Sequence, residues 1–220
     1  MRQLSRYELE FSVSHEVVME PLIRIDLEEV LNGGDPVIVE LGCGRKKKAG
    51  RIGIDKVDLT NVDIVADMEE GLSFLPDNSV DHIHCRSVIE HVANFENLLR
   101  EIVRVLKKNG KAHIFVPHFS NPYYYSDFTH RRPFGLYSFY YFVDHEGQLR
   151  RKVPNFYTDI RIRIISQRLV FRSSFKVINP VKKLFGWFLN LHTILQEYYE
   201  ENLCYAFPCH GIEVVFCPAS

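Results

Sequence analysis

Three acidic residues close short apolar runs in the first third of the chain, and glycines accompany the first of them. The segment Glu40-Leu-Gly-Cys-Gly44 ends one run, Ile52-Gly-Ile-Asp55 forms a second, and a third ends at Asp67. Glycine lets a backbone turn tightly and approach a ligand closely, and open α/β sheets bind ligands outside the carboxyl ends of their strands. A carboxylate at Asp55 can accept hydrogen bonds from both hydroxyls of a ribose, and one at Asp67 can accept from an exocyclic amine. The ordered series predicts a nucleoside site without a pyrophosphate.

The connection between the first two runs is short. Residues 42–51 leave no room for a full crossover helix, so little here can bind a phosphate at a helix N-terminus. A Rossmann-like NAD site has its acid about 20 residues past the glycines, with a full helix between them. Asp55 comes too early for that spacing, and the third glycine is absent because Arg45-Lys-Lys-Lys48 follows Gly44. An NAD-dependent dehydrogenase is therefore the least favoured enzyme class.

Apolar patterning indicates the elements that position these residues. Strands are expected at 37–41, 52–55, 62–67, 80–85 and 111–117. The segment 94–108 has apolar residues at helical spacing, Asn94 can cap its start, and Asn109-Gly110 ends it. Strands that alternate with helices predict a parallel sheet with right-handed crossovers.

Both ends of the chain carry further elements. Residues 16–32 show an amphipathic helical pattern, which Gly33-Gly34 ends because glycine adopts the left-handed conformation easily. Residues 211–218 form an apolar run that predicts a last strand.

The region between the fifth and the last strand is aromatic and then basic. In the basic stretch 150–183, the alternation Arg161-Ile-Arg-Ile164 indicates an edge strand, and the stretch is either a solvated face or a groove for an anionic acceptor. Asn179-Pro180 predicts the start of a helix that continues to about residue 202. We interpret this helix as a lid over an acceptor cleft, and an interfacial helix that touches a bilayer is the alternative.

Taken in order, these motifs resemble the motif series of class I S-adenosylmethionine-dependent methyltransferases, and most closely the type 11 group. The motifs that carry the resemblance are Glu40-Leu-Gly-Cys-Gly44, Gly53-Ile-Asp55, Asp63-Ile-Val-Ala-Asp67, Leu75-Pro-Asp-Asn-Ser-Val-Asp81, Glu90-His-Val92 and Arg104-Val-Leu-Lys-Lys-Asn-Gly110. The resemblance implies an α/β fold with a Rossmann-like, seven-stranded, mostly parallel sheet, an antiparallel last strand and a helical, aromatic cap. It also implies S-adenosyl-L-methionine as the methyl donor and S-adenosyl-L-homocysteine as the product.

We expect one methyltransferase domain over residues 1–220. Its parts are an N-terminal helical extension (1–35), a cofactor-binding core (36–118), an acceptor cap and insertion (119–205) and the last strand (206–220).

The resemblance also assigns residues to the cofactor. They are Glu40, Gly42, Cys43, Gly44, Asp55, Lys56, Asp67, Met68, Cys85 and Arg86. Gly42 and Gly44 would shape the loop under the methionine part, and Glu40 would orient that loop. Asp55 would hold the ribose hydroxyls, and Asp67 would read the adenine. The backbone of Met68 would also contact the adenine. Cys85 and Arg86, which end the fourth strand, would line the methionine part of the cofactor.

The acceptor side carries the candidates for a general base. A hydroxyl acceptor must lose a proton to a group within hydrogen-bond reach, and histidine is the usual choice near neutral pH. His118, Asp127 and His130 follow the fifth strand and are the candidates for the base and for acceptor positioning. We place His91 on a helix beneath the cleft. These residues can equally form a structural network that fixes a long loop.

The expected activity is therefore O-methylation of a small-molecule or glycan-type acceptor. N-methylation of a small amine, which needs no base, is the second hypothesis, and a non-catalytic cofactor-binding scaffold is the third. The acceptor can be anionic if the basic stretch 150–183 lines its groove.

Composition limits the partners. The net charge is −1, so no global field gathers nucleic acid or an anionic membrane. Hydrophobic residues make up 46% and charged residues 25%, which is ordinary globular composition. The five cysteines show no zinc-ligand pairing, so no metal is expected. No signal peptide or membrane-spanning run is apparent, which predicts a cytoplasmic protein, with peripheral membrane contact left open.

Overall fold

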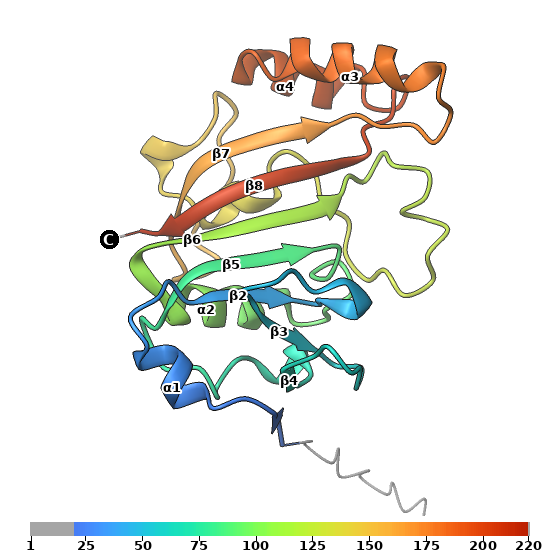
Figure 1. The fold of residues 1–220 in the computed structure, drawn as a ribbon. Coiled ribbons are helices and arrows are strands. Elements are labelled where there is room, and N and C mark those ends of the chain that lie inside the picture. Colours follow the sequence, from blue (N-terminus) through green and yellow to red (C-terminus); the bar gives the residue numbers. More distant parts are fainter. Residues whose placement is uncertain (1–19, 220) are drawn as a thin grey trace, which may run out of the picture.

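One mixed sheet carries the fold, with strand order β1-β4-β3-β2-β5-β6-β8-β7 (Figure 1). The structure is a computed structural model, and it describes residues 20–219. The strands are β1 (Leu22–Ile23), β2 (Ile38–Leu41), β3 (Ile52–Asp55), β4 (Ile64–Val65), β5 (Val80–Arg86), β6 (Leu106–Pro117), β7 (Ile162–Val170) and β8 (Gly211–Pro218).

The strand directions follow the expected α/β architecture. Strands β4, β3, β2, β5 and β6 run parallel to one another, and β8 is antiparallel to both β6 and β7. The Rossmann-like, mostly parallel sheet with an antiparallel last strand is therefore confirmed. Strand β1 pairs antiparallel with β4 and adds an eighth strand, which the sequence did not predict.

Helix α2 (Phe95–Val105) packs against the sheet as its periodicity predicts. Leu98, Leu99 and Ile102 are fully buried. The Asn94 side chain accepts a hydrogen bond from the backbone nitrogen of Asn97, so the predicted N-cap is confirmed. The expected helix end at residue 108 was too late, because the backbone is already extended at residue 106, where β6 begins.

The remaining connections between the parallel strands are short. A 3₁₀ turn, η1 (Gly44–Lys46), joins β2 to β3, and another, η2 (Met68–Glu70), follows β4. The prediction that the β2–β3 connection holds no full helix is confirmed. Among the described residues, α2 is the only α-helix that connects two of these parallel strands.

One face of the sheet carries a row of polar side chains. Glu40, His84 and His113 are register partners on β2, β5 and β6, and all three are half-buried. The two imidazole rings stack with centroids 4.6 Å apart. Burial, reinforced by the nearby Arg51, lowers the pKa of His84 to about 4.

The expected amphipathic helix over 16–32 is wrong for the part that the structure describes. Helix α1 spans only Leu27–Asn32, and the strand β1 precedes it; residues 16–19 lie outside the described residues. Asp26 starts the helix, because its side chain accepts a hydrogen bond from the backbone nitrogen of Glu29. The backbone nitrogen of Arg24 donates to the carbonyl of Asp63, so pairing with β4 prevents an earlier helix.

The helix expected over 180–202 is two helices, α3 (Ile178–Leu189) and α4 (Thr193–Asn202). Asn190 separates them, because its side chain exchanges hydrogen bonds with the backbone of Leu169 on β7. Asn179-Pro180 was expected to start the helix with Asn179 as its N-cap, but α3 begins at Ile178 and the Asn179 side-chain oxygen accepts from the backbone nitrogen of Ser173. In Figure 1 both helices lie beyond β7, whereas β3 and β4 lie toward the opposite edge of the sheet.

Strand β7 forms one edge of the sheet, which confirms the edge strand expected around Arg161-Ile-Arg-Ile164. Across residues 20–219, no helix has the length and apolar character needed to cross a membrane.

Candidate active site

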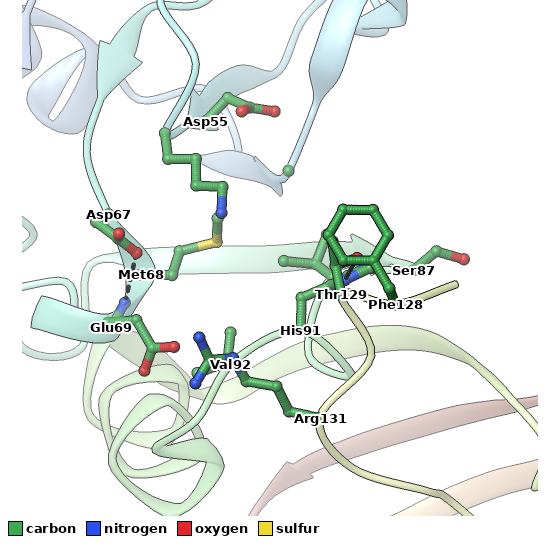
Figure 2. A pocket seen from close by; sticks show the side chains of 13 residues that line it. Asp55, Asp67, Met68, Glu69, Ser87, His91, Val92, Phe128, Thr129 and Arg131 are labelled. Atoms are coloured by element: carbon green, nitrogen blue, oxygen red, sulfur yellow. Dashed lines mark hydrogen bonds between the residues drawn. The ribbon is translucent and has the colours of Figure 1, made fainter. Parts of the chain in front are cut away.

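A cavity of about 810 Å³ opens beyond the carboxyl ends of β2, β3, β4 and β5 (Figure 2). Its lining residues come from the loops that follow these strands and from one later segment: Gly42, Asp55, Lys56, Asp67, Met68, Glu69, Ser87, Val88, His91, Val92, Phe128, Thr129 and Arg131. The volume lies within the range of about 300–1,000 Å³ that small-molecule sites occupy. The position is the one expected for ligands of open α/β sheets.

Asp55 holds the glycine loop in place. One carboxylate oxygen accepts a hydrogen bond from the backbone nitrogen of Gly44 at 2.8 Å, and the other accepts from that of Val57 at 3.0 Å. Each oxygen keeps a further lone pair, so the carboxylate can still accept from a ligand hydroxyl.

The position of Gly42 has no room for a side chain. Its φ is +64°, and a Cβ at this position would lie 2.1 Å from Cγ2 of Val88. The loop after β2 therefore packs directly against the loop after β5, and the backbone borders the cavity.

The loop after β4 forms the opposite wall. Asp67 caps η2 by accepting from the backbone nitrogen of Glu69 at 3.0 Å. The Glu69 carboxylate in turn accepts from the backbone nitrogens of Ala93 and Asn94, at 2.6 and 3.1 Å. These bonds fix the distance between η2 and the start of α2. Figure 2 shows Asp67, Met68 and Glu69 together on this wall.

The predicted cofactor residues divide between two places. Gly42, Asp55, Lys56, Asp67 and Met68 line the large cavity.

Three others, Glu40, Cys85 and Arg86, line a second cavity of about 300 Å³, which shares only Gly42 with the first. Glu40 accepts from the backbone nitrogen of Lys48 and lies 3.5 Å from the Arg51 guanidinium. Its carboxylate therefore holds the far end of the glycine loop.

Two predicted cofactor residues, Cys43 and Gly44, line neither cavity. Cys43 is buried, and this burial raises its pKa to about 11. The backbone nitrogen of Gly44 bonds to Asp55, so its contribution is to the loop.

Residues of the expected acceptor cap complete the large cavity. Phe128, Thr129 and Arg131 line it from the loop after β6; in the view of Figure 2, Phe128 and Thr129 lie across from Asp67, and the Arg131 side chain extends toward the side of Glu69. Residues 150–183 and helices α3 and α4 line neither of these two cavities, so neither the lid nor the alternative of a basic groove gains support from them.

His91 also lines the cavity, which corrects its expected place on a helix beneath the cleft. Residues 87–93 form turns between β5 and α2, so the side chain stays at the mouth of the sheet. The position directly after β5 was the signal that could have found it.

The structure gathers His91 with two of the predicted catalytic residues into an acid–histidine cluster, consisting of Glu90, His91, Asp127 and His130. His130 Nε2 lies 3.6 Å from an oxygen of Asp127 and 4.0 Å from one of Glu90. The rings of His91 and His130 lie 4.7 Å apart. Glu90 is fully buried, and burial raises its pKa to about 7.

His118 is not in this cluster, which corrects its expected role as a base in the cleft. Its side chain is fully buried and borders neither cavity. Nδ1 lies 2.8 Å from the hydroxyl of Ser120, and Nε2 lies 2.8 Å from the carboxylate of Glu200 on α4. Because both ring nitrogens have partners, His118 links α4 to the loop after β6. This fits the alternative that it belongs to a structural network fixing a long loop.

Comparisons with known proteins agree with this geometry. Residues 39–114 match the model of a family described as a methyltransferase domain. No curated protein sequence matched the chain. A Haloferax volcanii protein solved with the Trm112 methyltransferase activator has a similar structure, at 15% identity over 88% of each chain and a TM-score of 0.50.

Two further solved structures are similar. One is a SAM-dependent methyltransferase from Archaeoglobus fulgidus (17% identity, 83% of this chain and 86% of that chain, TM-score 0.49). The other is a geranyl diphosphate C-methyltransferase from Streptomyces coelicolor (15% identity, 84% of this chain and 72% of that chain, TM-score 0.49).

The sheet order, the cavity at its carboxyl edge and the match over 39–114 support a class I S-adenosyl-L-methionine-dependent methyltransferase. The same family match supports an enzyme, and S-adenosyl-L-methionine is the cofactor consistent with it. The cavity fits this group, because it combines a glycine without a Cβ at Gly42 with carboxylates at Asp55 and Asp67.

Proposed function

We propose that this enzyme transfers the methyl group to an oxygen atom of a small-molecule or glycan-type acceptor. The observation that supports the proposal is the cavity itself, which joins Asp55 and Asp67 to His91, Thr129 and Arg131 without interruption. A side chain that can accept a proton, His91, thus lines the same cavity as the proposed nucleoside residues.

The proposed cofactor residues follow the cavity. Asp55 binds the ribose hydroxyls with its remaining lone pairs, and Asp67 with the backbone of Met68 binds the adenine. Lys56 lies beside them in the lining. Glu40 acts through the loop, because it holds the backbone of Lys48.

A bound S-adenosyl-L-methionine supplies an electrophilic methyl group. The chain contributes position, since holding a nucleophile in line with the methyl group lowers the barrier by several kcal/mol, and about 7–11 kcal/mol in the best oriented reactions. Phe128 and Thr129 border the space for the acceptor, and Arg131 favours an acceptor that carries a negative group. The proton of an acceptor hydroxyl leaves toward the acid–histidine cluster, the nearest set of proton acceptors to this space.

We also propose a cytoplasmic location. All five cysteines are free and buried, which suits a reducing compartment.

The test is an acceptor screen with S-adenosyl-L-methionine labelled in its methyl group. Panels of alcohols, sugars, phosphorylated sugars and amines are incubated with the enzyme, and each labelled product is examined by NMR for the methylated atom. Methyl ethers or esters support the proposal. N-methyl products from amines at comparable or higher kcat/KM would overturn it. Cofactor binding with no turnover on any acceptor would favour the non-catalytic scaffold.

A further inference from the structure

The acid–histidine cluster contains a buried carboxylate without a partner. Both oxygens of Glu90 are fully buried and lack a hydrogen-bond partner among residues 20–219. Nε2 of His130 lies 4.0 Å from one of these oxygens, which is beyond hydrogen-bond distance. The backbone nitrogens of Arg131 and Arg132 donate to the Glu90 carbonyl, so neither compensates the carboxylate. A buried carboxylate is stabilised by a paired charge, a metal ion or a bound proton.

Two histidines offer nitrogen lone pairs next to this carboxylate. One ligating atom from each of Glu90, His91 and His130 lies within 4.8 Å of the other two. Ligands of a tetrahedral ion with bonds of about 2.0–2.2 Å lie about 3.3–3.6 Å apart. A contraction of about 1 Å therefore brings the three groups to an ion, which the turn at 87–93 and the loop around residue 130 can supply because neither is in a helix or strand.

The hydrogen bonds around His130 orient it as a ligand. Its Nδ1 lies 2.8 Å from the carbonyl of Tyr124, so Nδ1 carries the proton and Nε2 keeps its lone pair. The Tyr124 ring stacks on the imidazole at 4.8 Å and holds its plane. Metal-bound histidines usually donate their other N–H to a carbonyl or a carboxylate in this way.

His91 is oriented by a comparable chain of contacts. The Thr129 hydroxyl donates its hydrogen to Asp127 at 2.6 Å, so its oxygen accepts from Nδ1 of His91, 2.9 Å away. Nε2 of His91 therefore keeps its lone pair as well. Both imidazoles are in the tautomer that leaves Nε2 free, and both have a fixed partner for the other nitrogen.

We propose that Glu90, His91 and His130 bind a divalent first-row transition-metal ion in the wall of the cofactor cavity. Two imidazole nitrogens and one carboxylate suit Zn²⁺ or Co²⁺, whereas Mg²⁺ and Ca²⁺ prefer sites built from oxygen alone. Because His91 lines the cavity, the remaining coordination position faces the acceptor side. This proposal departs from the expectation, drawn from the cysteine pattern, that no metal is bound. Ion binding does not depend on which atom receives the methyl group.

The experiment is a titration of the purified full chain, first treated with a chelator and then dialysed. Zn²⁺ binding is measured by calorimetry, and Co²⁺ binding by visible absorption, which reports the coordination geometry without any need for activity. The expected result is one saturable site per chain for both ions and no binding of Mg²⁺. Glu90→Gln and His130→Gln are each expected to lower the affinity at least tenfold.

Two control variants separate this site from other histidines. His145→Gln removes an exposed histidine on the turn η4 (His145–Gly147), and His84→Gln disrupts the stacked pair on the sheet; both are expected to bind as the wild type does. Retained binding of S-adenosyl-L-homocysteine verifies that each variant folds. Glu90→Gln removes a buried charge and keeps the side-chain shape, so it is expected to fold. The proposal is overturned if the wild type shows no saturable site, if Glu90→Gln and His130→Gln bind unchanged, or if His84→Gln abolishes binding.

Discussion

The carboxylate of Asp55 accepts a hydrogen bond from the backbone nitrogen of Gly44 at 2.8 Å. The last residue of β3 thereby fixes the loop that follows β2, and the same side chain faces the cavity. Loop geometry therefore depends on this carboxylate, and in our proposal cofactor binding depends on it as well.

Replacing Asp55 is expected to abolish the stabilisation that the cofactor product gives. S-adenosyl-L-homocysteine at about 100 times its Kd stabilises a protein by about 2.7 kcal/mol, which raises the Tm of a chain this size by roughly 5–10 °C. Asp55→Asn loses the charge and one acceptor, so little or no rise is expected in a thermal-shift assay. Asp58→Asn changes a neighbouring exposed carboxylate and is expected to keep the full rise. An equal rise in Asp55→Asn would contradict the proposed ribose site.

The glycine loop predicts a difference between two otherwise similar substitutions. Gly42 and Gly44 both have positive φ, so alanine costs about 1–2 kcal/mol at either position. Only at Gly42 does the new Cβ meet Val88. Chemical denaturation is therefore expected to show Gly42→Ala less stable than Gly44→Ala by at least about 1 kcal/mol. Adding Val88→Ala to Gly42→Ala should reduce the gap, and identical stabilities for the two single variants would refute the close contact.

His118 is expected to affect stability and leave cofactor binding unchanged. His118→Ala leaves one oxygen of the nearly buried Glu200 carboxylate without its partner, while the other still accepts from the backbone nitrogen of Leu136, and is expected to cost about 3 kcal/mol. The affinity for S-adenosyl-L-homocysteine, measured by calorimetry below the Tm, is expected to change less than twofold. A large loss of affinity for S-adenosyl-L-homocysteine in a folded variant would indicate that His118 contributes to the cofactor site after all.

The stacked pair on the sheet predicts acid sensitivity. The pKa of His84 is about 4 in the folded chain and 6.5 as the ordinary value. The unfolded chain takes up this proton first, so His84 lowers stability as the pH falls from about 6.5 to about 4. Denaturant midpoints at pH 7 and pH 5 should differ less in His84→Gln than in the wild type. His145→Gln is expected to keep the wild-type difference, and an unchanged difference in His84→Gln would contradict the prediction.

Local sequence predicted the parts of the fold that local forces determine. Asp55 and Asp67 stand at the ends of apolar runs, so β3 and β4 could be located, and Asn94 lies directly before a regular apolar stripe, so α2 could be located. The side chains of Asp55 and Asp67 reach the cavity because parallel strands end at one edge of the sheet.

Contacts between distant segments account for the errors. His118 finds its partner 82 residues later in Glu200, and Asn190 ends α3 through Leu169 on another strand. His91 was misplaced for a different reason. It was expected on a helix, but α2 begins only at Phe95, so His91 lies in the turns that precede it.

The position of β8 has a consequence for biosynthesis. It lies between β6 and β7, yet it is made after both of them. Until β8 emerges from the ribosome, β7 has no strand to pair with and β6 keeps one open edge. Exposed strand edges recruit other chains. A nascent chain that stalls before Gly211 is therefore at its most aggregation-prone, and chaperone contact is most valuable in that interval.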